Sequence, residues 1–486
     1  MNYECVIGLE VHVQINTESK LFCSCPTFFG APPNSQICPI CAGYPGVLPV
    51  LNKKAVESLI KTALALDCAV NQESIFARKQ YFYPDLPKNY QISQYEKPLA
   101  ENGILIPFST TGEDKKIKIK RIHLEEDAGK LIHTIGATEL DYSLVDLNRT
   151  GIPLMEIVSE PDMSSAKQAQ DYLTTLKMIL EYLKVSDCNM EKGSLRCDAN
   201  ISIRPVGTKT LGNRVELKNM NSFRGVHDAL VFEMERQIQA LESGGRIVQE
   251  TRLWDTDRKQ SESMRSKEEA HDYRYFPEPD LLPLKVTSPW IEEIRAQLPE
   301  LPHQKRKRFI QTYSLSEYDT MVLTSNPELA EFYEKSISFL PQKKEAAKLI
   351  SNWLTTELLG RLNSSNKTIL ESPINPEALS ELVKLILDGV ISGKIAKNVF
   401  EEMWKEHKKP SHVVKEKGWV QVQDEKEIEN WVTLSIAQNP KAVEEFMKGK
   451  EKALGALVGA VMKLSKGQAN PELVHQILQK KLKKTL

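Results

Sequence analysis

The order of apolar and polar residues predicts several strands in the first 220 positions. Polar and apolar residues alternate in GLEVHVQ (8–14), RIHLEEDAGKLIH (121–133), RCDANISIR (196–204) and RVELK (214–218). Side chains on a strand point alternately to its two faces, so each segment has one apolar and one polar face. We therefore expect these segments to form strands of an antiparallel sheet with one buried face.

Helical periodicity separates these strands. Apolar residues recur at helical spacing after Asn52, after Asp162 and from Ser222 to the glycine pair at 244–245. Asn52 is a favourable N-cap residue, and a glycine pair commonly ends a helix. The apolar stripes are typical of helices packed in a core. We therefore predict an α+β domain over residues 1–292.

Beyond the prolines at 289, 299 and 302, the alternation stops and the pattern becomes helical throughout. We predict a helical domain over 293–408 and a helical tail domain over 409–486. Nine lysines and two glutamates lie between Lys448 and Leu486. Such a positive balance can contact nucleic-acid phosphates, although a solvated lysine-rich tail is the alternative.

The composition is that of an ordinary soluble chain, with 27% charged and 41% hydrophobic residues. No run of 18 or more apolar residues occurs, and the start MNYECVIGLE lacks the features of a signal peptide. We therefore expect a cytoplasmic protein that does not enter a membrane. The formal net charge of −1 neither requires nor excludes a nucleic-acid partner.

Four of the eight cysteines form two close pairs, Cys23 with Cys25 and Cys38 with Cys41. In a reducing compartment, clustered cysteines more often bind a metal than form disulfides. Four thiolates suit tetrahedral Zn²⁺ in a closed structural site. The zinc site would form an insertion at 23–41 in the first domain. The alternative is two pairs of ordinary reduced cysteines.

The polar strand faces are dense in carboxylates, histidine and arginine. Converging carboxylates and a histidine suit a hard divalent cation such as Mg²⁺, and neighbouring Arg and Lys suit phosphate. A solvated sheet face remains the alternative. The aromatic and basic segments 78–95 and 271–284 would bind a nucleotide base or an RNA end, or simply pack on the surface. The sequence has no P-loop, no G-x-S-x-G motif and no dinucleotide-binding glycine motif.

Seven long segments closely resemble the B subunits of the aspartyl/glutamyl-tRNA amidotransferases, the GatB family. They are YECVIGLEVHVQINTESKLFC, YFYPDLPKNYQISQY, RIHLEEDAGKLIH, GIPLMEIVSEPD, GSLRCDANISIRP, VELKNMNSF and MRSKEEAHDYRYFPEPDL. A weaker match, KALGALVGAVMKLSKGQANPELV, extends the resemblance to the tail. The departures are minor: Cys188 stands where many members have glycine.

The resemblance implies a ligase that forms carbon–nitrogen bonds with glutamine as amide donor. ATP would phosphorylate the side-chain carboxylate of misacylated Glu-tRNA(Gln), Asp-tRNA(Asn) or both. Ammonia from a partner amidase (the glutaminase, or A, subunit) would then displace the phosphate within a heterotrimer that also contains a small C subunit. The resemblance further implies a cradle-like first domain with the kinase pocket on its concave face, and a tail that binds tRNA.

The resemblance also gives each polar residue an expected role. The expected catalytic residues are Glu10, His12, Glu125, Asp127, Asp198 and Glu216. The first three of these would bind Mg²⁺. Lys79, Lys88 and Arg149 would balance phosphate or substrate charge, or line the ammonia route. Two other hypotheses stay open: a non-catalytic tRNA-binding scaffold, and a stand-alone metal-dependent hydrolase.

Overall fold

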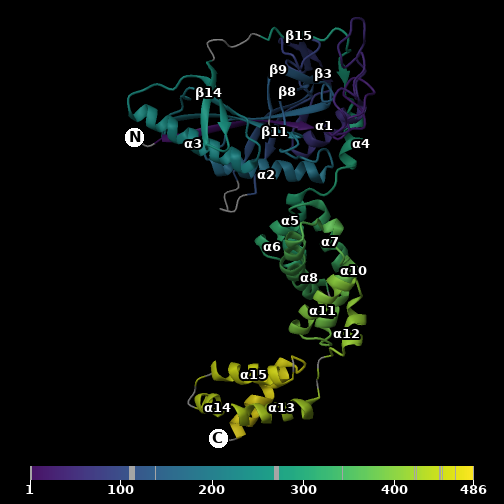
Figure 1. The fold of residues 1–486 in the computed structure, drawn as a ribbon, viewed down its shortest axis with the longest axis vertical. Coiled ribbons are helices and arrows are strands. Elements are labelled where there is room, and N and C mark those ends of the chain that lie inside the picture. The colour runs from purple at the N-terminus through teal and green to yellow at the C-terminus, as the bar shows by residue number, and fades with distance from the viewer. Residues whose placement is uncertain are drawn as a thin grey trace. The chain divides into compact units, whose positions relative to one another are not determined.

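The computed structural model covers the whole chain and contains two compact units, residues 1–301 and 302–486 (Figure 1). It describes residues 3–108, 115–136, 138–266, 273–341, 343–420, 422, 424–447, 450, 452–465 and 467–484. Part of the segment 271–284, which the sequence links to a base or an RNA end, therefore lies outside the described residues.

The first unit is built on a nine-stranded sheet with the order β14-β13-β12-β11-β1-β10-β7-β6-β2. Neighbouring strands are antiparallel except β12 and β13, which are parallel. The strands are β1 (Tyr3–Gln14), β2 (Ala69–Val70), β6 (Ala100–Leu105), β7 (Ile117–Glu126), β10 (Pro153–Ser159), β11 (Leu195–Pro205), β12 (Val215–Lys218), β13 (Glu250–Asp255) and β14 (Gln260–Ser266). Three of the four predicted strands are confirmed as β1, β11 and β12. The fourth, 121–133, is wrong as a single strand, because β7 ends at Glu126 and the chain continues after a break as β8 (Lys130–Ile135) in another sheet.

Three smaller sheets accompany the large one. They are β15 (Phe276–Pro277) with β4 (Ala77–Gln80) and β5 (Tyr90–Ser93), β16 (Leu284–Lys285) with β3 (Glu73–Ser74), and β8 (Lys130–Ile135) with β9 (Thr138–Asp146). The strand β5 lies beside the end of β7, where Ile92 N donates to Glu126 Oε1 at 2.9 Å. The small sheet of β4 and β5 therefore stands next to the polar segment of β7.

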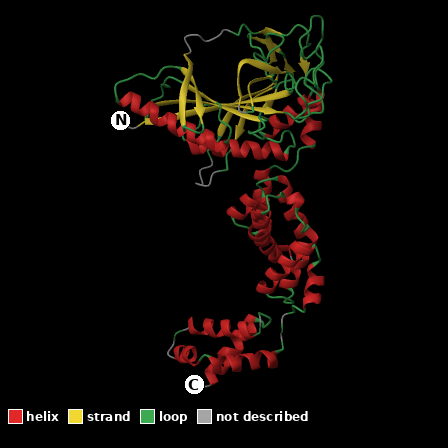
Figure 2. Cartoon of the chain, viewed as in Figure 1, coloured by secondary structure: helices red, strands yellow, loops and turns green. Residues whose placement is uncertain are grey.

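Helices cover the apolar face of the large sheet (Figure 2). They are α1 (Lys53–Ala65), α2 (Ala166–Tyr182) and α3 (Phe223–Glu242), and α4 (Ser288–Ala296) packs beside α1. The side chains of Asn52, Ser165 and Ser222 accept hydrogen bonds from the first turns of α1, α2 and α3. The three predicted helices are thus confirmed. Because the helices bury one face, the polar residues of the strands are left on the other.

The second unit is helical. Its helices are α5 (Pro302–Tyr313), α6 (Glu317–Leu323), α7 (Pro327–Ser338), α8 (Lys343–Asn352), the π-helix η2 (Trp353–Leu358), α9 (Leu359–Ser364), the 3₁₀-helix η3 (Ile369–Glu371), α10 (Pro376–Leu387), α11 (Gly393–Glu406), α12 (Pro410–Lys417), α13 (Glu425–Gln438), α14 (Pro440–Met447), α15 (Lys452–Leu464) and α16 (Pro471–Lys484). It has two hydrophobic cores, one running from Phe309 to Val414 and one from Ile428 to Leu482. The helix α12 contributes Val413 and Val414 to the first of these cores.

None of the helices in the described part of the chain is both long enough and apolar enough to cross a membrane.

Candidate functional site

The strand register places a row of polar side chains across the middle of the large sheet. His12 on β1 lies opposite Glu156 on β10 and opposite Arg196 on β11. Glu156 in turn lies opposite His123 on β7. Residues directly opposite one another share a face, and Glu125, two positions after His123, shares it as well. The sheet thus gathers residues far apart in the sequence on one face.

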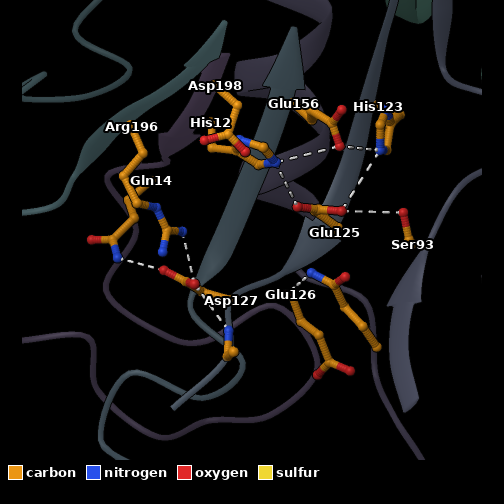
Figure 3. A network of polar contacts seen from close by, with 12 residues as sticks. His12, Gln14, Ser93, His123, Glu125, Glu126, Asp127, Glu156, Arg196 and Asp198 are labelled. Atoms are coloured by element: carbon orange, nitrogen blue, oxygen red, sulfur yellow. Dashed lines mark hydrogen bonds and ion pairs between the residues drawn. The ribbon is translucent and has the colours of Figure 1, made fainter. Parts of the chain in front are cut away.

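Two histidines and two glutamates meet at this row (Figure 3). His12 Nε2 lies 3.5 Å from Glu156 Oε2 and 3.6 Å from Glu125 Oε1. His123 Nε2 lies 3.2 Å from Glu156 Oε2 and 3.7 Å from Glu125 Oε2. Ser93 Oγ on β5 donates to Glu125 Oε2 at 3.3 Å. Each carboxylate is therefore in contact with both imidazoles.

The electrostatics keep this cluster ionised. Burial alone would raise the pKa of Glu125 and Glu156, but contacts with the histidines lower both, that of Glu156 well below its usual range. Burial alone would lower the pKa of His12, but Glu156 and Glu125 raise it to about 9. At neutral pH the cluster thus combines two carboxylates with at least one imidazolium, that of His12.

The donors of His12, Glu125 and Glu156 fit a divalent cation. One ligand atom from each of these residues lies within 4.8 Å of the others. Ionised carboxylates are the ligands that Mg²⁺ and Mn²⁺ prefer, and His12 Nε2 becomes a ligand when a bound cation displaces its proton. We name these three residues the HEE group.

Glu156 has no role among the residues that the sequence analysis selected. Its strand, PLMEIVS, does not alternate in polarity, and Leu154, Met155 and Ile157 are all buried. The available signal was a single carboxylate within an otherwise apolar strand. A buried glutamate without a partner is costly, so this signal alone indicates that Glu156 is paired or binds a cation.

The other predicted carboxylates lie on the same face but outside the HEE group. Asn200 Nδ2 donates to Glu10 Oε1 at 2.9 Å. Lys218 Nζ lies 2.5 Å from Asp198 Oδ2 and 3.3 Å from Glu216 Oε1. Burial and the nearby carboxylates raise the pKa of Glu10. Glu10 therefore sits in a crowded acidic environment, whereas Lys218 neutralises the other two.

Asp127 lies just beyond the end of β7 and is held by basic and amide groups. It accepts hydrogen bonds from Arg196 Nη2 at 2.8 Å and from Gln14 Nε2 at 2.7 Å (Figure 3). Arg149 Nε lies 3.8 Å away and donates to Ala128 O at 2.9 Å. Burial alone would raise the pKa of Asp127, but the two arginines lower it. Asp127 and Arg149 thus fix the chain where it leaves the sheet.

The two predicted lysines lie in different surroundings. Lys79 on β4 lies 5.0 Å from the ring centroid of Tyr273 and 6.0 Å from that of Tyr81. Burial alone would lower its pKa, but Glu125, Tyr275 and Glu156 raise it, so Lys79 is a charged neighbour of the HEE group. Lys88 instead pairs with Glu126.

Beside the HEE group, the polar face is hollowed into a cleft of about 520 Å³, which we name the sheet cleft. Its lining includes Gly8, Glu10, Tyr95, Lys120, Arg121, Glu156, Asn200, Gly212 and Arg214. The ring of Tyr95 stacks on that of Tyr275 with centroids 4.2 Å apart. The cleft thus joins three cationic side chains to one of the HEE carboxylates.

The four clustered cysteines form a second candidate metal site. One sulfur from each of Cys23, Cys25, Cys38 and Cys41 lies within 4.8 Å of the others, and Cys41 Sγ is 4.0 Å from Cys25 Sγ and 3.9 Å from Cys38 Sγ. Tetrahedral Zn²⁺ with bonds of about 2.3 Å separates its sulfurs by about 3.8 Å. These distances fit Zn²⁺.

One thiol of this cluster is already disposed to ionise. A contact with Cys23, together with the nearby cation of Lys20, lowers the pKa of Cys41 to about 4. Lys20 Nζ lies 3.5 Å from Cys41 Sγ and is almost completely buried. A thiolate is the form that binds a metal, so Cys41 is prepared for a metal. The contact with Cys41 and burial raise the pKa of Cys23, whereas burial and the neighbouring thiols raise that of Cys25.

Comparison with known proteins gives consistent matches over the length of the chain. Residues 5–292 match the GatB/GatE catalytic domain family, and residues 332–482 match the GatB domain family. The chain is 56% identical to the B subunit of the aspartyl/glutamyl-tRNA(Asn/Gln) amidotransferase of Carboxydothermus hydrogenoformans, with 99% of each chain covered. It is also 56% identical to the protein of the same name from Thermoanaerobacter pseudethanolicus, with 100% of each chain covered, and 54% identical to that from Geobacter sulfurreducens, with 99% of this chain and 100% of the relative covered.

Proposed function

Because the chain belongs to the GatB family, we propose that it is the B subunit of a tRNA-dependent amidotransferase. In this proposal it phosphorylates the side-chain carboxylate of Glu-tRNA(Gln), Asp-tRNA(Asn) or both, and then completes the amide with ammonia. The observation that carries the proposal is the position of the HEE group beside the sheet cleft, where Lys120, Arg121 and Arg214 supply positive charge.

The reaction needs two transfers. In the first, an oxygen of the substrate carboxylate attacks the γ-phosphorus of ATP, the bond to the β,γ-bridging oxygen breaks, and ADP leaves. In the second, the nitrogen of ammonia attacks the acyl carbon, the carbon–oxygen bond to phosphate breaks, and the nitrogen loses a proton. Phosphorylation is necessary because a carboxylate is a poor electrophile, whereas phosphate is a good leaving group.

His12, Glu125 and Glu156 would hold a Mg²⁺ ion, whose charge would neutralise phosphate oxygens. The cationic side chains of Lys120, Arg121 and Arg214 would bind and orient the phosphates of ATP. Lys79 would provide a fixed positive charge next to the HEE group, where negative charge develops on the transferred phosphoryl group. The stacked rings of Tyr95 and Tyr275 at the cleft offer an apolar surface for a base.

The remaining parts of the chain have supporting roles in this proposal. The four cysteines would bind a structural Zn²⁺ ion that fixes the loop at 23–41. Ammonia would come from a partner amidase, the A subunit, in a heterotrimer with a small C subunit. The lysine-rich helices of the tail would hold the body of the tRNA through its phosphates.

Reconstitution tests this proposal. The full chain is mixed with the amidase and the small C subunit, ATP, Mg²⁺, glutamine and each misacylated tRNA in turn, and amidated tRNA and ADP are measured. We expect one ADP for each amide, and no amide when ATP is omitted. ATP hydrolysis that is independent of misacylated tRNA would favour a metal-dependent hydrolase. Absence of ATP turnover in the presence of misacylated tRNA would favour a scaffold role.

A further inference from the structure

His123 is a buried histidine with only part of its hydrogen-bonding capacity in use. It lies on β7 with 2% of its surface exposed. Its Nε2 lies near both glutamates of the HEE group, whereas its Nδ1 is buried with no hydrogen-bond partner among the described residues. An unpartnered buried polar atom costs stability, and an apolar side chain at this position would avoid that cost. The histidine at this position therefore keeps the contacts of Nε2 at a cost to the stability of the folded protein.

The two histidines that contact the carboxylates differ in how far they are buried. The His12 side chain is 21% exposed and those of Glu156 and Glu125 are 11% and 3% exposed, whereas that of His123 is 2% exposed. His123 Nε2 faces the Oε2 atom of each glutamate, whereas His12 Nε2 faces Oε1 of Glu125 and shares Oε2 of Glu156 with His123. The fully buried His123 therefore contacts the second oxygen of Glu125 and adds a second contact to Glu156.

We propose that His123 is a positioning residue, whose Nε2–H fixes Glu125 and Glu156 so that a divalent cation binds between them and His12. The inference deepens the proposed function, because the cation is the one assigned to the HEE group. Without His123, Glu125 would keep its contacts with Ser93 Oγ and His12, and Glu156 would keep its contact with His12. Two adjacent carboxylates would then separate through repulsion, and the three ligands would lose their common geometry.

Three substitutions separate this role from simple packing. His123→Gln keeps a nitrogen donor at the same number of bonds from Cα as Nε2, so it can still reach Glu156. His123→Asn is also polar, but its amide nitrogen corresponds to Nδ1 and falls short of both glutamates. His123→Leu fills the space and removes the donor. The matched control is His133→Leu, because His133 is an exposed histidine on β8, the next strand along the chain, which belongs to another sheet.

The first readout is metal binding by the full chain. The protein is purified without chelators and without added metal, so that the cysteine cluster keeps its own zinc. It is then titrated with Mn²⁺, and unbound Mn²⁺ is measured by electron paramagnetic resonance. Loss of a residue that orients metal ligands typically weakens binding 10- to 100-fold. We therefore expect His123→Asn and His123→Leu to weaken Mn²⁺ binding at least tenfold. We expect His123→Gln to stay within about threefold of the wild type, and His133→Leu to match the wild type.

Unchanged or tighter Mn²⁺ binding by both His123→Asn and His123→Leu would overturn the proposal, since His123 would then only compete with the cation for the carboxylates. A wild-type chain that binds no Mn²⁺ would also overturn it. If His123→Leu does not fold, the comparison of Asn with Gln decides, and equal binding by those two variants would reject a positioning role.

The second readout is amide formation by the reconstituted complex at increasing Mg²⁺. We expect His123→Asn to raise the Mg²⁺ concentration for half-maximal rate while the KM for misacylated tRNA stays unchanged. A fall in rate that no Mg²⁺ concentration relieves, with normal Mn²⁺ binding, would contradict positioning. If the wild type forms no amide but the Mn²⁺ affinities differ as expected, the proposed function fails and the role of His123 stands.

Discussion

Glu156 and His12 stand directly opposite each other on the adjacent strands β10 and β1, with His12 Nε2 3.5 Å from Glu156 Oε2. Glu156→Gln keeps the shape of the side chain and removes the charge that a hard cation requires. We expect amide formation to fall at least about 100-fold and the Mg²⁺ requirement to rise. Glu125→Gln should have the same effect, and Glu18→Gln, at an exposed position, serves as the control.

Glu10 provides a sharper comparison, because it lies on the same face but outside the HEE group. We expect Glu10→Gln to lower the rate without changing the Mg²⁺ concentration for half-maximal activity, since Glu10 contacts Asn200 in the sheet cleft. Rates measured over a range of Mg²⁺ decide the question. If Glu10→Gln raised the Mg²⁺ requirement as much as Glu125→Gln, Glu10 would be a ligand, as the resemblance to the GatB family implies.

The sheet cleft leads to a prediction about ATP. Removing Arg121 or Arg214 by substitution with alanine takes away a charge-assisted contact to phosphate. We expect each variant to raise the KM for ATP about tenfold, which corresponds to about 1.4 kcal/mol. The KM for glutamine should not change. Arg258→Ala is the control, because Arg258 is an exposed arginine between β13 and β14. Equal KM values for ATP in all variants would show that the phosphates of ATP do not bind in this cleft.

The cysteine cluster predicts a metal content. Protein purified without chelators should contain about one zinc per chain. Cys41→Ser removes the sulfur with the lowered pKa and should abolish zinc binding and lower the unfolding temperature. Cys68→Ser is the control, since Cys68 is a buried free cysteine outside the cluster. Full zinc content in Cys41→Ser, measured by elemental analysis, would show that the cluster does not hold the metal.

The lysine-rich tail leads to a prediction about tRNA binding. A chain that ends at residue 423 keeps α12, whose Val413 and Val414 belong to the preceding core. We expect the truncated complex to bind tRNA more weakly. The slope of the logarithm of the binding constant against the logarithm of the salt concentration should become flatter by roughly 0.7 to 0.9 for each lysine–phosphate pair that the truncation removes. Hydrolysis of glutamine in the absence of tRNA should continue. A soluble truncated complex with unchanged affinity and salt dependence would refute the role of the tail.

The second unit contains a carboxylate whose effect on stability depends on pH. Burial alone would raise the pKa of Asp319, but contacts with Lys348 and Ser316 lower it below its ordinary value of 3.8. A carboxylate with a lowered pKa stabilises the folded state above its unfolded-state pKa, and this contribution is lost as the pH falls through the folded-state pKa.

We therefore expect Asp319→Asn to destabilise α6 by about 1 kcal/mol at pH 7, and to make no difference at a pH below the folded-state pKa of Asp319. Hydrogen exchange of the α6 amides, compared between the two proteins at the same pH, measures this. A difference that persists equally at both pH values would show that Asp319 acts through packing and not through its charge.

Local patterns in the sequence were sufficient to identify β1, β7, β11, β12 and the first three helices, but not β10, whose residues do not alternate in polarity. The alternation in GLEVHVQ and the caps at Asn52 and Ser222 depend on neighbouring residues, and such signals do not need a tertiary structure. The two cysteine pairs could also be recognised as a candidate zinc site from the sequence, because their spacing determines whether the thiolates can bind one ion.

The three residues of the HEE group could not be predicted from local sequence patterns. His12, Glu125 and Glu156 come together only because β1 pairs with β10 and β10 with β7. Strand order and register depend on pairing between segments that are distant in the sequence, and periodicity within one strand does not specify them. The same reasoning explains why the ion pairs of Asp198 and Glu216 were not predicted. Both residues lie on the predicted polar face, but only the strand register shows that Lys218 lies between them.

The central position of β1 has a consequence for the newly made protein. This 12-residue strand is synthesised first, but its partners β10 and β11 lie at 153–159 and 195–205. At about 5 to 20 residues per second, β1 waits roughly 7 to 30 s on the ribosome before β10 has been made. An unpaired strand is prone to aggregate, and charged side chains along it oppose pairing with other chains. We expect Glu10 and His12, besides the roles proposed for them in the folded protein, to protect the nascent chain during that interval.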